Sequence, residues 1–268
     1  MQTQNFPILY EDESMLVIDK PSGVTVNRSE TTKDNTIQDW AEKHIGIERN
    51  GDSQRVGAYL GDTEATGEYS PRKDFFVRGG VVHRLDKETS GVLVLAKTPE
   101  SFERLQREFK ERVVEKTYIA LAHGRVAPPI GEIRAPVGRL PWNRKQFGIV
   151  AGGRESVTKY KTISNFRPKD DQPLADKHEV YTLLELYPQT GRTHQIRVHL
   201  KHIGHPIFAD FLYAGRKTAR SDRHVFSRVF LHAHSLSLVH PVTEKHMTFT
   251  SPTPQDIQVF LDRLEKVE

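Results

Sequence analysis

The sequence predicts an α+β fold on a mixed, mostly antiparallel sheet. Segments with strand character outnumber those with helical spacing, and the two kinds do not alternate as they would in a βαβ protein. No internal repeat or low-complexity tract interrupts the chain. With 268 residues, 36% of them hydrophobic and 28% charged, it is large enough to bury a substantial core. We therefore expect one domain over residues 1–268.

The N-terminal part predicts two strands and then a long polar region. Residues 8–10 and 15–18 have strand character and flank an acidic turn, and the second strand ends at the turn 19–23. Residues 28–80 are polar and contain several glycines, with one short amphipathic segment over 37–45. This region has too few apolar residues for a core of its own. We interpret it as an insertion or loop region rather than a separate domain.

The rest of the chain predicts three helices among strands. One helix begins with Thr98 as its N-cap and Pro99 at its first position. A second helix has Thr193 as its cap and ends at Gly204. The third begins at residues 253–254, and we expect its Leu264 to face inward. Loops are expected around 128–129 and over 139–147. Strands are predicted over residues 92–95, 117–122, 156–163, 179–187, 229–239 and 247–250.

Composition excludes several classes of protein. The chain has no cysteine, which removes disulfides, thiolate metal sites and cysteine nucleophiles. No apolar run approaches the ~18 residues of a membrane span, and the first five residues lack signal-peptide character, so we expect a cytoplasmic protein. There is no phosphate-binding glycine loop, dinucleotide fingerprint or G-x-S-x-G motif.

The stretch 83–91, with sequence HRLDKETSG, is the first candidate for chemistry. It holds Arg84 and Asp86 two residues apart, just before the apolar run at 92–96. Charged groups are rarely buried without a partner, so a nearby cation would keep Asp86 ionised. Such a carboxylate can act as a nucleophile, a general base or an electrostatic stabiliser. The alternative is a turn aspartate that caps a neighbouring backbone group.

The stretch 190–200, with sequence TGRTHQIRVHL, is the second candidate. Gly191 permits a tight turn, and Arg197 lies four residues after Thr193, on the same helical face. The free amides at this helix start could bind an anion. A solvated surface helix is the alternative. Nearby, His199 and His202 have ligand spacing, but no H-E-x-x-H motif accompanies them, so we expect hydrogen-bonded or surface histidines and no metal.

Basic residues gather in two further clusters. The chain carries a net charge of +4, which suits a polyanionic partner. Basic residues interleaved with aromatic ones can contact both phosphates and bases. Solvated loops are the alternative for each cluster. The first consists of Arg139, Arg144 and Lys145 around Trp142 and Phe147, and the second of Arg216, Lys217, Arg220 and Arg223.

Several blocks together resemble the pseudouridine synthases of the ribosomal large-subunit synthase A (RluA) type. They follow the family order from about residue 8 to 250, which makes the resemblance more specific than any single motif. The blocks are DKPSG at 19–23, HRLDKETSG at 83–91, EKTY at 115–118, GRTHQIRVHL at 191–200, GHPI at 204–207 and LHA at 231–233.

The resemblance implies an isomerase that converts a uridine of rRNA or tRNA to pseudouridine without a cofactor or metal. It implies a central mixed sheet in two halves with the active cleft between them. Asp86 matches the essential aspartate, Tyr118 the tyrosine that stacks on the flipped base, and Arg197 the arginine paired with the aspartate. Arg84 matches a residue that enters the RNA stack when the uridine leaves.

Other expectations concern RNA binding and the competing functions. Only seven residues precede the first strand, so we expect no separate N-terminal RNA-binding domain, and a monomer is the default. A non-catalytic RNA assembly factor on the same fold is one alternative. A nucleoside or sugar hydrolase that uses Asp86 and Glu88 is another. The residues expected to bind RNA are His83, Arg84, Lys87, Arg139, Arg144, Lys145 and Arg192.

Overall fold

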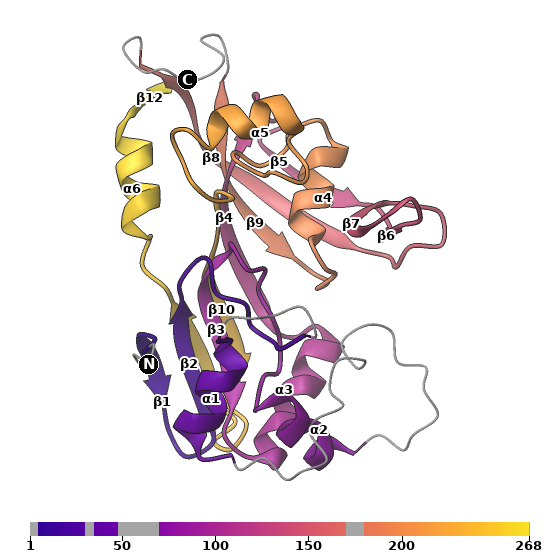
Figure 1. Ribbon diagram of the computed structural model, residues 1–268, viewed down its shortest axis with the longest axis vertical. Coiled ribbons are helices and arrows are strands. Elements are labelled where there is room, and N and C mark those ends of the chain that lie inside the picture. Colours follow the sequence, from indigo (N-terminus) through magenta and orange to yellow (C-terminus); the bar gives the residue numbers. More distant parts are fainter. Residues whose placement is uncertain (1–4, 30–34, 48–69, 170–179, 268) are drawn as a thin grey trace. The chain divides into compact units, whose positions relative to one another are not determined.

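The computed structural model describes residues 5–29, 35–47, 70–169 and 180–267 (Figure 1). The chain forms two compact units. The first unit consists of Met1–Val114 and Leu236–Ser251, and the second of Glu115–Ser235 and Pro252–Glu268. Two units agree with the expected sheet in two halves. The extent of the domain over 1–268 stays a prediction.

The first unit is built on antiparallel strands. β2 pairs with β1 and with β3, in a register that places Met15 opposite Ala96 and Lys20 opposite Gly91. The sheet continues from β3 to β10, and β11 pairs with β10. The apolar run of β3 is buried along its whole length, as expected for a central strand. The strands are β1 (Ile8–Glu11), β2 (Met15–Lys20), β3 (Ser90–Ala96), β10 (Leu231–Val239) and β11 (His246–Thr250).

The described residues of the first unit form three helices: α1 (Ile37–Ile45), α2 (Pro71–Arg78) and α3 (Pro99–Glu111). The Thr98 side chain accepts a hydrogen bond from the Ser101 N–H at 3.1 Å, so the expected cap of α3 is confirmed. The amphipathic segment over 37–45 is also confirmed, as α1. A second helix in the polar region, α2, was not predicted, and much of that region, 48–69, lies outside the described residues.

The second unit has the strand order β10-β4-β9-β8-β12, with β5 paired to β8. β10 supplies residues to both units, because its first residues, 231–235, belong to the second unit and 236–239 to the first. The core of the second unit includes Leu184, Phe208 and Phe230, all 0% exposed. The elements are β4 (Glu115–His123), β5 (Ile130–Arg134), β8 (Val157–Pro168), β9 (Tyr181–Pro188), α4 (Gln195–His202), α5 (Arg216–Asp222), α6 (Gln255–Asp262) and β12 (Leu264–Val267).

A hairpin of β6 (Val137–Leu140) and β7 (Asn143–Ile149) replaces the basic loop predicted over 139–147. One proline, two glycines and three cations obscure its strand pattern in the sequence. Gly138 and Gly148 are opposite each other in this hairpin. A Cβ atom at Gly148 would lie 2.6 Å from Leu140 Cδ2, so the glycine makes room for the leucine that packs across it. Figure 1 shows the hairpin next to α4.

Other boundaries also differ from the prediction. Thr193 does not cap α4; the helix follows His194, which has φ 56° and makes no side-chain cap bond. Leu264 is buried but lies in β12, because α6 has already ended at Asp262. β5 and α5 were not predicted: β5 is stabilised by its long-range pairing with β8, a contact that leaves no local signal.

Candidate active site

The 83–91 loop of the first unit presents its charged residues around a buried anchor. Leu85 is 4% exposed, whereas Arg84 and Lys87 are exposed and Asp86 is half-buried. The Thr89 N–H donates to the Asp86 carbonyl at 3.1 Å and closes the turn that leads into β3. The leucine fixes the loop to the core, so the Asp86 carboxylate is attached to a defined backbone.

A buried lysine ties this loop to the turn after β2. Lys20 is 0% exposed, and its Nζ donates to the carbonyls of Pro21, Val24 and Lys87 at 2.9, 2.9 and 3.1 Å. The Gly23 N–H also donates to the Lys87 carbonyl, at 2.8 Å. Hydrogen bonding at each of these carbonyls offsets the cost of burying an ammonium group. Sequence reasoning interpreted 19–23 as a turn and as one of the family blocks, but missed this role of Lys20.

His83 is also held within the first unit. The Val94 N–H donates to His83 Nε2 at 2.9 Å, so the ring accepts a hydrogen bond there and carries its proton on Nδ1 when neutral. The ring stacks on Phe109 of α3, with centroids 4.5 Å apart and an interplanar angle of 21°. These contacts connect the start of the candidate loop to the last turns of α3. An RNA contact by His83 stays a prediction.

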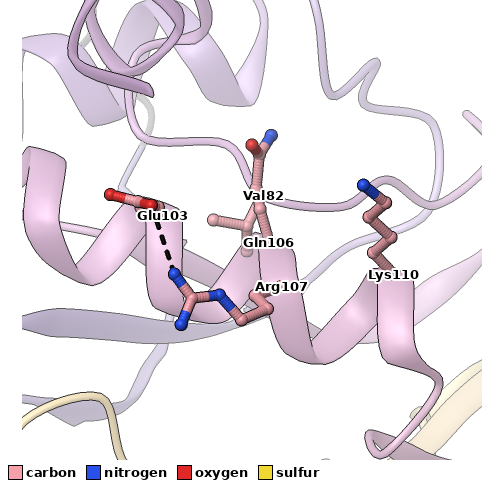
Figure 2. Close-up of a pocket in the computed structure, with 5 residues that line it drawn as sticks. All are labelled: Val82, Glu103, Gln106, Arg107 and Lys110. Carbon is pink, nitrogen blue, oxygen red and sulfur yellow. Dashed lines mark hydrogen bonds and ion pairs between the residues drawn. The ribbon is translucent and has the colours of Figure 1, made fainter. Parts of the chain in front are cut away.

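A pocket of about 360 Å³ lies beside α3 (Figure 2). Val82, which directly precedes His83, contributes to its lining. Its lining residues are Val82, Glu103, Gln106, Arg107 and Lys110. An ion pair of 3.2 Å joins Arg107 Nη2 to Glu103 Oε1, as the dashed line in Figure 2 shows. Because Glu103 neutralises Arg107, Lys110 is the lining cation whose charge this ion pair leaves unbalanced, and we assign the pocket no ligand.

In the second unit, Gln195 organises the segment that leads into α4. Its Oε1 accepts from Thr190 Oγ1 at 2.6 Å and from the Arg192 N–H at 3.0 Å. Its Nε2 donates to the Val157 carbonyl and to Thr158 Oγ1, both at 3.0 Å. The amide therefore ties the turn before α4 to β8, while the helix start itself has no side-chain cap. Arg192 is half-buried in this turn.

His199 completes the same network. It is 0% exposed, with Nδ1 2.9 Å from Thr158 Oγ1 and Nε2 3.1 Å from the Ala135 carbonyl. Burial lowers the pKa of His199, which favours the neutral ring. The expectation of a hydrogen-bonded histidine is confirmed here. Within the described ranges, no group of three or more His, Asp or Glu residues could hold a metal ion.

Arg197 forms a buried ion pair with Asp210. Its Nε and Nη2 atoms lie 2.8 Å from Asp210 Oδ2 and Oδ1, and the two side chains are 8% and 0% exposed. Asp210 Oδ1 also accepts from the Leu212 and Tyr213 N–H groups. This bidentate contact engages two of the five guanidinium donors. Sequence reasoning missed Asp210, since nothing local distinguishes it from a surface turn residue.

An aromatic cluster connects the hairpin to α4. The guanidinium of Arg139 lies 4.9 Å from the centroid of the Phe147 ring, which meets the His194 ring edge-on at 5.5 Å. Tyr213 Oη accepts from the Phe147 N–H at 3.0 Å and lies 2.8 Å from His194 Nδ1. Arg197 lies 5.0 Å from the Tyr213 ring centroid. The structure thus joins Arg139 and Arg197 through one cluster within the second unit.

The remaining predicted site residues have simpler settings. Tyr118 is half-buried on β4, opposite Leu186 of β9. Arg144 and Lys145 lie on β7, and their side chains are outside the described part of the chain. Tyr118, Arg192 and Arg197 belong to the second unit, whereas Asp86 and its loop belong to the first.

Comparison with known proteins shows which protein family this chain resembles. The model of the family described as RNA pseudouridylate synthase matches residues 14–202. An uncharacterised RNA pseudouridine synthase of Chloroflexus aurantiacus is 42% identical over 189 residues, which cover 70% of this chain and 54% of that relative. The ribosomal large subunit pseudouridine synthase D of Pseudomonas aeruginosa is 34% identical over 267 residues, covering 97% of this chain and 72% of that relative.

A solved structure supports the fold. The human RNA pseudouridylate synthase domain containing 1 protein superposes with a TM-score of 0.69 at 24% identity, covering all of this chain and 91% of that one. The fold is therefore that of the pseudouridylate synthases. The chain belongs to the RNA pseudouridylate synthase family and is an RNA pseudouridine synthase, an isomerase. The resemblance found in the sequence is confirmed.

Proposed function

We propose that this chain isomerises a specific uridine of ribosomal RNA and that Asp86 is its catalytic carboxylate. The match over residues 14–202 carries the proposal, since it includes both the 83–91 loop and the start of α4. Two relatives are named for the large ribosomal subunit, which makes large-subunit rRNA the first substrate to test and tRNA the second.

In the proposed reaction, the N1–C1′ bond breaks, the uracil rotates and a C5–C1′ bond forms. N1 gains a proton and C5 loses one, so no co-reactant is consumed. Asp86 acts at the sugar, either by attack on C1′ or by removal of the C2′ proton. The anchor at Leu85 and the carbonyls bound to Lys20 support this role, because they fix the loop backbone before substrate binds.

The other residues have roles that follow from their chemistry. Tyr118 stacks on the flipped base, and Arg197 stabilises the ionised Asp86, with Asp210 holding the guanidinium plane. Arg84 is exposed on the loop and fills the position that the uridine leaves in the RNA stack. His83, Lys87, Arg139, Arg144, Lys145 and Arg192 contribute contacts to RNA.

The direct test is pseudouridine mapping at single-nucleotide resolution. RNA from a deletion strain is compared with RNA from the parent strain, and purified protein is then added to the deletion-strain RNA. We expect one or a few positions to lose pseudouridine on deletion and regain it with wild-type protein but not with Asp86→Asn. If no cellular RNA gains pseudouridine, the proposal is wrong.

The same variant separates the alternatives. An assembly factor without catalysis would still rescue the deletion phenotype as Asp86→Asn. A hydrolase using Asp86 and Glu88 would release free uracil, whereas a synthase keeps the base attached. Chromatography of the reaction supernatant distinguishes these outcomes.

A monomer in the cytoplasm is the state that fits a ribosomal substrate. No helix in the described ranges is long and apolar enough to cross a membrane. Light scattering of the purified protein tests the oligomeric state. A stable dimer at working concentration would contradict that part of the proposal.

A further inference from the structure

The tip of the β6–β7 hairpin exposes a tryptophan. Trp142 is 80% exposed, the largest exposed fraction among the large hydrophobic residues that the structure describes. Tryptophan carries a large apolar surface that is normally covered, so its position at a turn calls for an explanation. Phe147, the other aromatic residue of the basic segment, packs in the cluster around Tyr213 instead.

The hairpin that carries Trp142 is held firmly at its base. The Phe147 N–H donates to Tyr213 Oη at 3.0 Å, and Gln146 Nε2 donates to the Leu212 carbonyl at 3.0 Å. Val137 is 3% exposed and exchanges two backbone hydrogen bonds with Arg154, at 3.0 and 2.9 Å. A ring on such a support loses little freedom when a ligand covers it.

The charge around the tip indicates the partner. Residues 139–147 contain three cations and no carboxylate. Arg139 is exposed in β6 and lies over the Phe147 ring, so its charge is fixed on the same hairpin as Trp142. A flat apolar ring beside cations suits a ligand with planar faces and a polyanionic backbone. Unpaired RNA has both features, whereas the bases of a duplex are covered by their neighbours.

We propose that Trp142 is a stacking platform for an unpaired base of the substrate RNA other than the target uridine. The inference rests on the proposed function for the identity of the ligand and adds a specificity-determining contact to it. Stacking on Trp142 would select RNAs that place a single-stranded nucleotide at the hairpin when the target uridine is in the active site. The cations of the hairpin bind the backbone without sequence preference.

Tryptophan fluorescence tests the contact directly. The chain has two tryptophans, and Trp40 stacks on His44 in the first unit, so the Trp40→Phe variant reports Trp142 alone. We expect a short unstructured RNA oligonucleotide to quench the emission as it binds, and a fully paired duplex of the same composition to quench it much less at equal occupancy. Unchanged emission with bound single-stranded RNA, or equal quenching by the duplex, would overturn the inference.

Affinity measurements separate stacking from general apolar contact. Trp142→Leu should weaken the binding of the unstructured RNA about ten-fold, and Trp142→Phe should weaken it less. The slope of log Kd against log salt concentration should stay unchanged, because no phosphate contact is lost. Ile130→Ala, which removes an apolar side chain 67% exposed on β5, is the matched control and should bind as the wild type does. Equal affinity of Trp142→Leu and wild type, or equal losses in the two Trp142 variants, would contradict stacking.

Pseudouridine mapping on the same preparation keeps the two proposals apart. A protein that forms pseudouridine while RNA leaves Trp142 emission unchanged would overturn the stacking inference alone. A protein whose Trp142 is quenched by unpaired RNA but which modifies no cellular RNA would overturn the proposed function alone.

Discussion

The candidate site includes one buried cation in each unit: Lys20 in the first and Arg197 in the second. The two cations are stabilised by different kinds of partner. In the first unit, Lys20 donates to three backbone carbonyls around the 83–91 loop. In the second unit, Arg197 on α4 forms a bidentate ion pair with the carboxylate of Asp210. A compact ammonium with three rotatable donors suits carbonyls that converge from several directions, whereas the planar guanidinium suits a carboxylate.

This difference predicts which substitutions each site tolerates. Lys20 donates to three main-chain carbonyls, which no side-chain substitution removes, so the lysine itself is the sensitive position. Arg197 depends on a side chain, and the loss of either member removes the buried countercharge of the other. The first arrangement holds a loop backbone, and the second fixes the orientation of one guanidinium.

Removal of one member of the Arg197–Asp210 pair should have the largest effect on stability. We expect Asp210→Ala to lower the free energy of unfolding by about 3–5 kcal/mol, because the buried guanidinium loses its carboxylate. The double variant Arg197→Met/Asp210→Ala should cost clearly less than the sum of the single variants Arg197→Met and Asp210→Ala. Urea unfolding of the four proteins measures the coupling. Additive effects would show that the pair does not act as a unit.

Loss of the Lys20 ammonium should have the next largest effect. We expect Lys20→Met to lower the free energy of unfolding by about 2–4 kcal/mol, because buried carbonyls lose their donor. Hydrogen exchange should rise at the amides of 22–24 and 86–89 more than in the second unit. Lys97→Met, which removes a surface ammonium ion-paired with Glu11 in the same unit, is the control and should stay within about 1 kcal/mol of wild type. Uniform exchange across both units would contradict a local role for Lys20.

Tyr213→Phe tests the contact between the hairpin and α4 with a smaller change. The variant keeps the ring beside Arg197 but removes the hydroxyl that accepts from the Phe147 N–H. We expect a loss of about 1 kcal/mol in unfolding free energy and a faster exchange of the Phe147 amide. Tyr187→Phe is the matched control, since its hydroxyl bonds only the neighbouring Glu185 on β9 among its described hydrogen bonds. Protection of the Phe147 amide equal to wild type would contradict the contact.

Mild acid should weaken the network behind α4. Burial lowers the pKa of His199, so the unfolded chain binds this proton at a higher pH than the folded chain does. The contribution of His199 is therefore complete above the ordinary histidine pKa of about 6.5 and is lost as pH falls below it, with a slope of at most about 1.4 kcal/mol per pH unit. Urea unfolding between about pH 5.5 and 7.5 measures this slope. A His199→Gln variant with the same slope as wild type would contradict the assignment.

Local signals made some elements predictable, and tertiary contacts hid the others. The cap and apolar spacing of α3 lie within a few residues, and the sequence predicted that helix correctly. The β6–β7 hairpin depends on Gly148 making room for Leu140 and on its packing near Tyr213, so its basic, proline-containing sequence suggested a loop. The predicted start of α4 was wrong because Thr193 does not cap it: the helix follows His194 at φ 56°, and the Gln195 amide bonds to Val157 and Thr158, which are distant in the sequence.

The residues of the candidate site also fall into those that the sequence predicted and those that it missed. Asp86 and Arg197 were predicted because each stands in a dense motif whose order along the chain matches the family, and their catalytic roles stay predictions. Lys20 and Asp210 were missed because their importance depends on partners that fold toward them: the Lys87 carbonyl is 67 residues from Lys20, and Asp210 is 13 residues from Arg197. Sequence patterns indicated the groups proposed to act on the substrate, but not the residues that hold them.

The most direct test of the account is the single-turnover rate of pseudouridine formation by Asp86→Asn, measured together with its RNA affinity. Asparagine keeps the size of the side chain and removes its negative charge. We predict a rate slower by about a hundred-fold or more, with an RNA affinity close to that of the wild type. A rate near that of the wild type would contradict the assignment of Asp86 as the catalytic carboxylate.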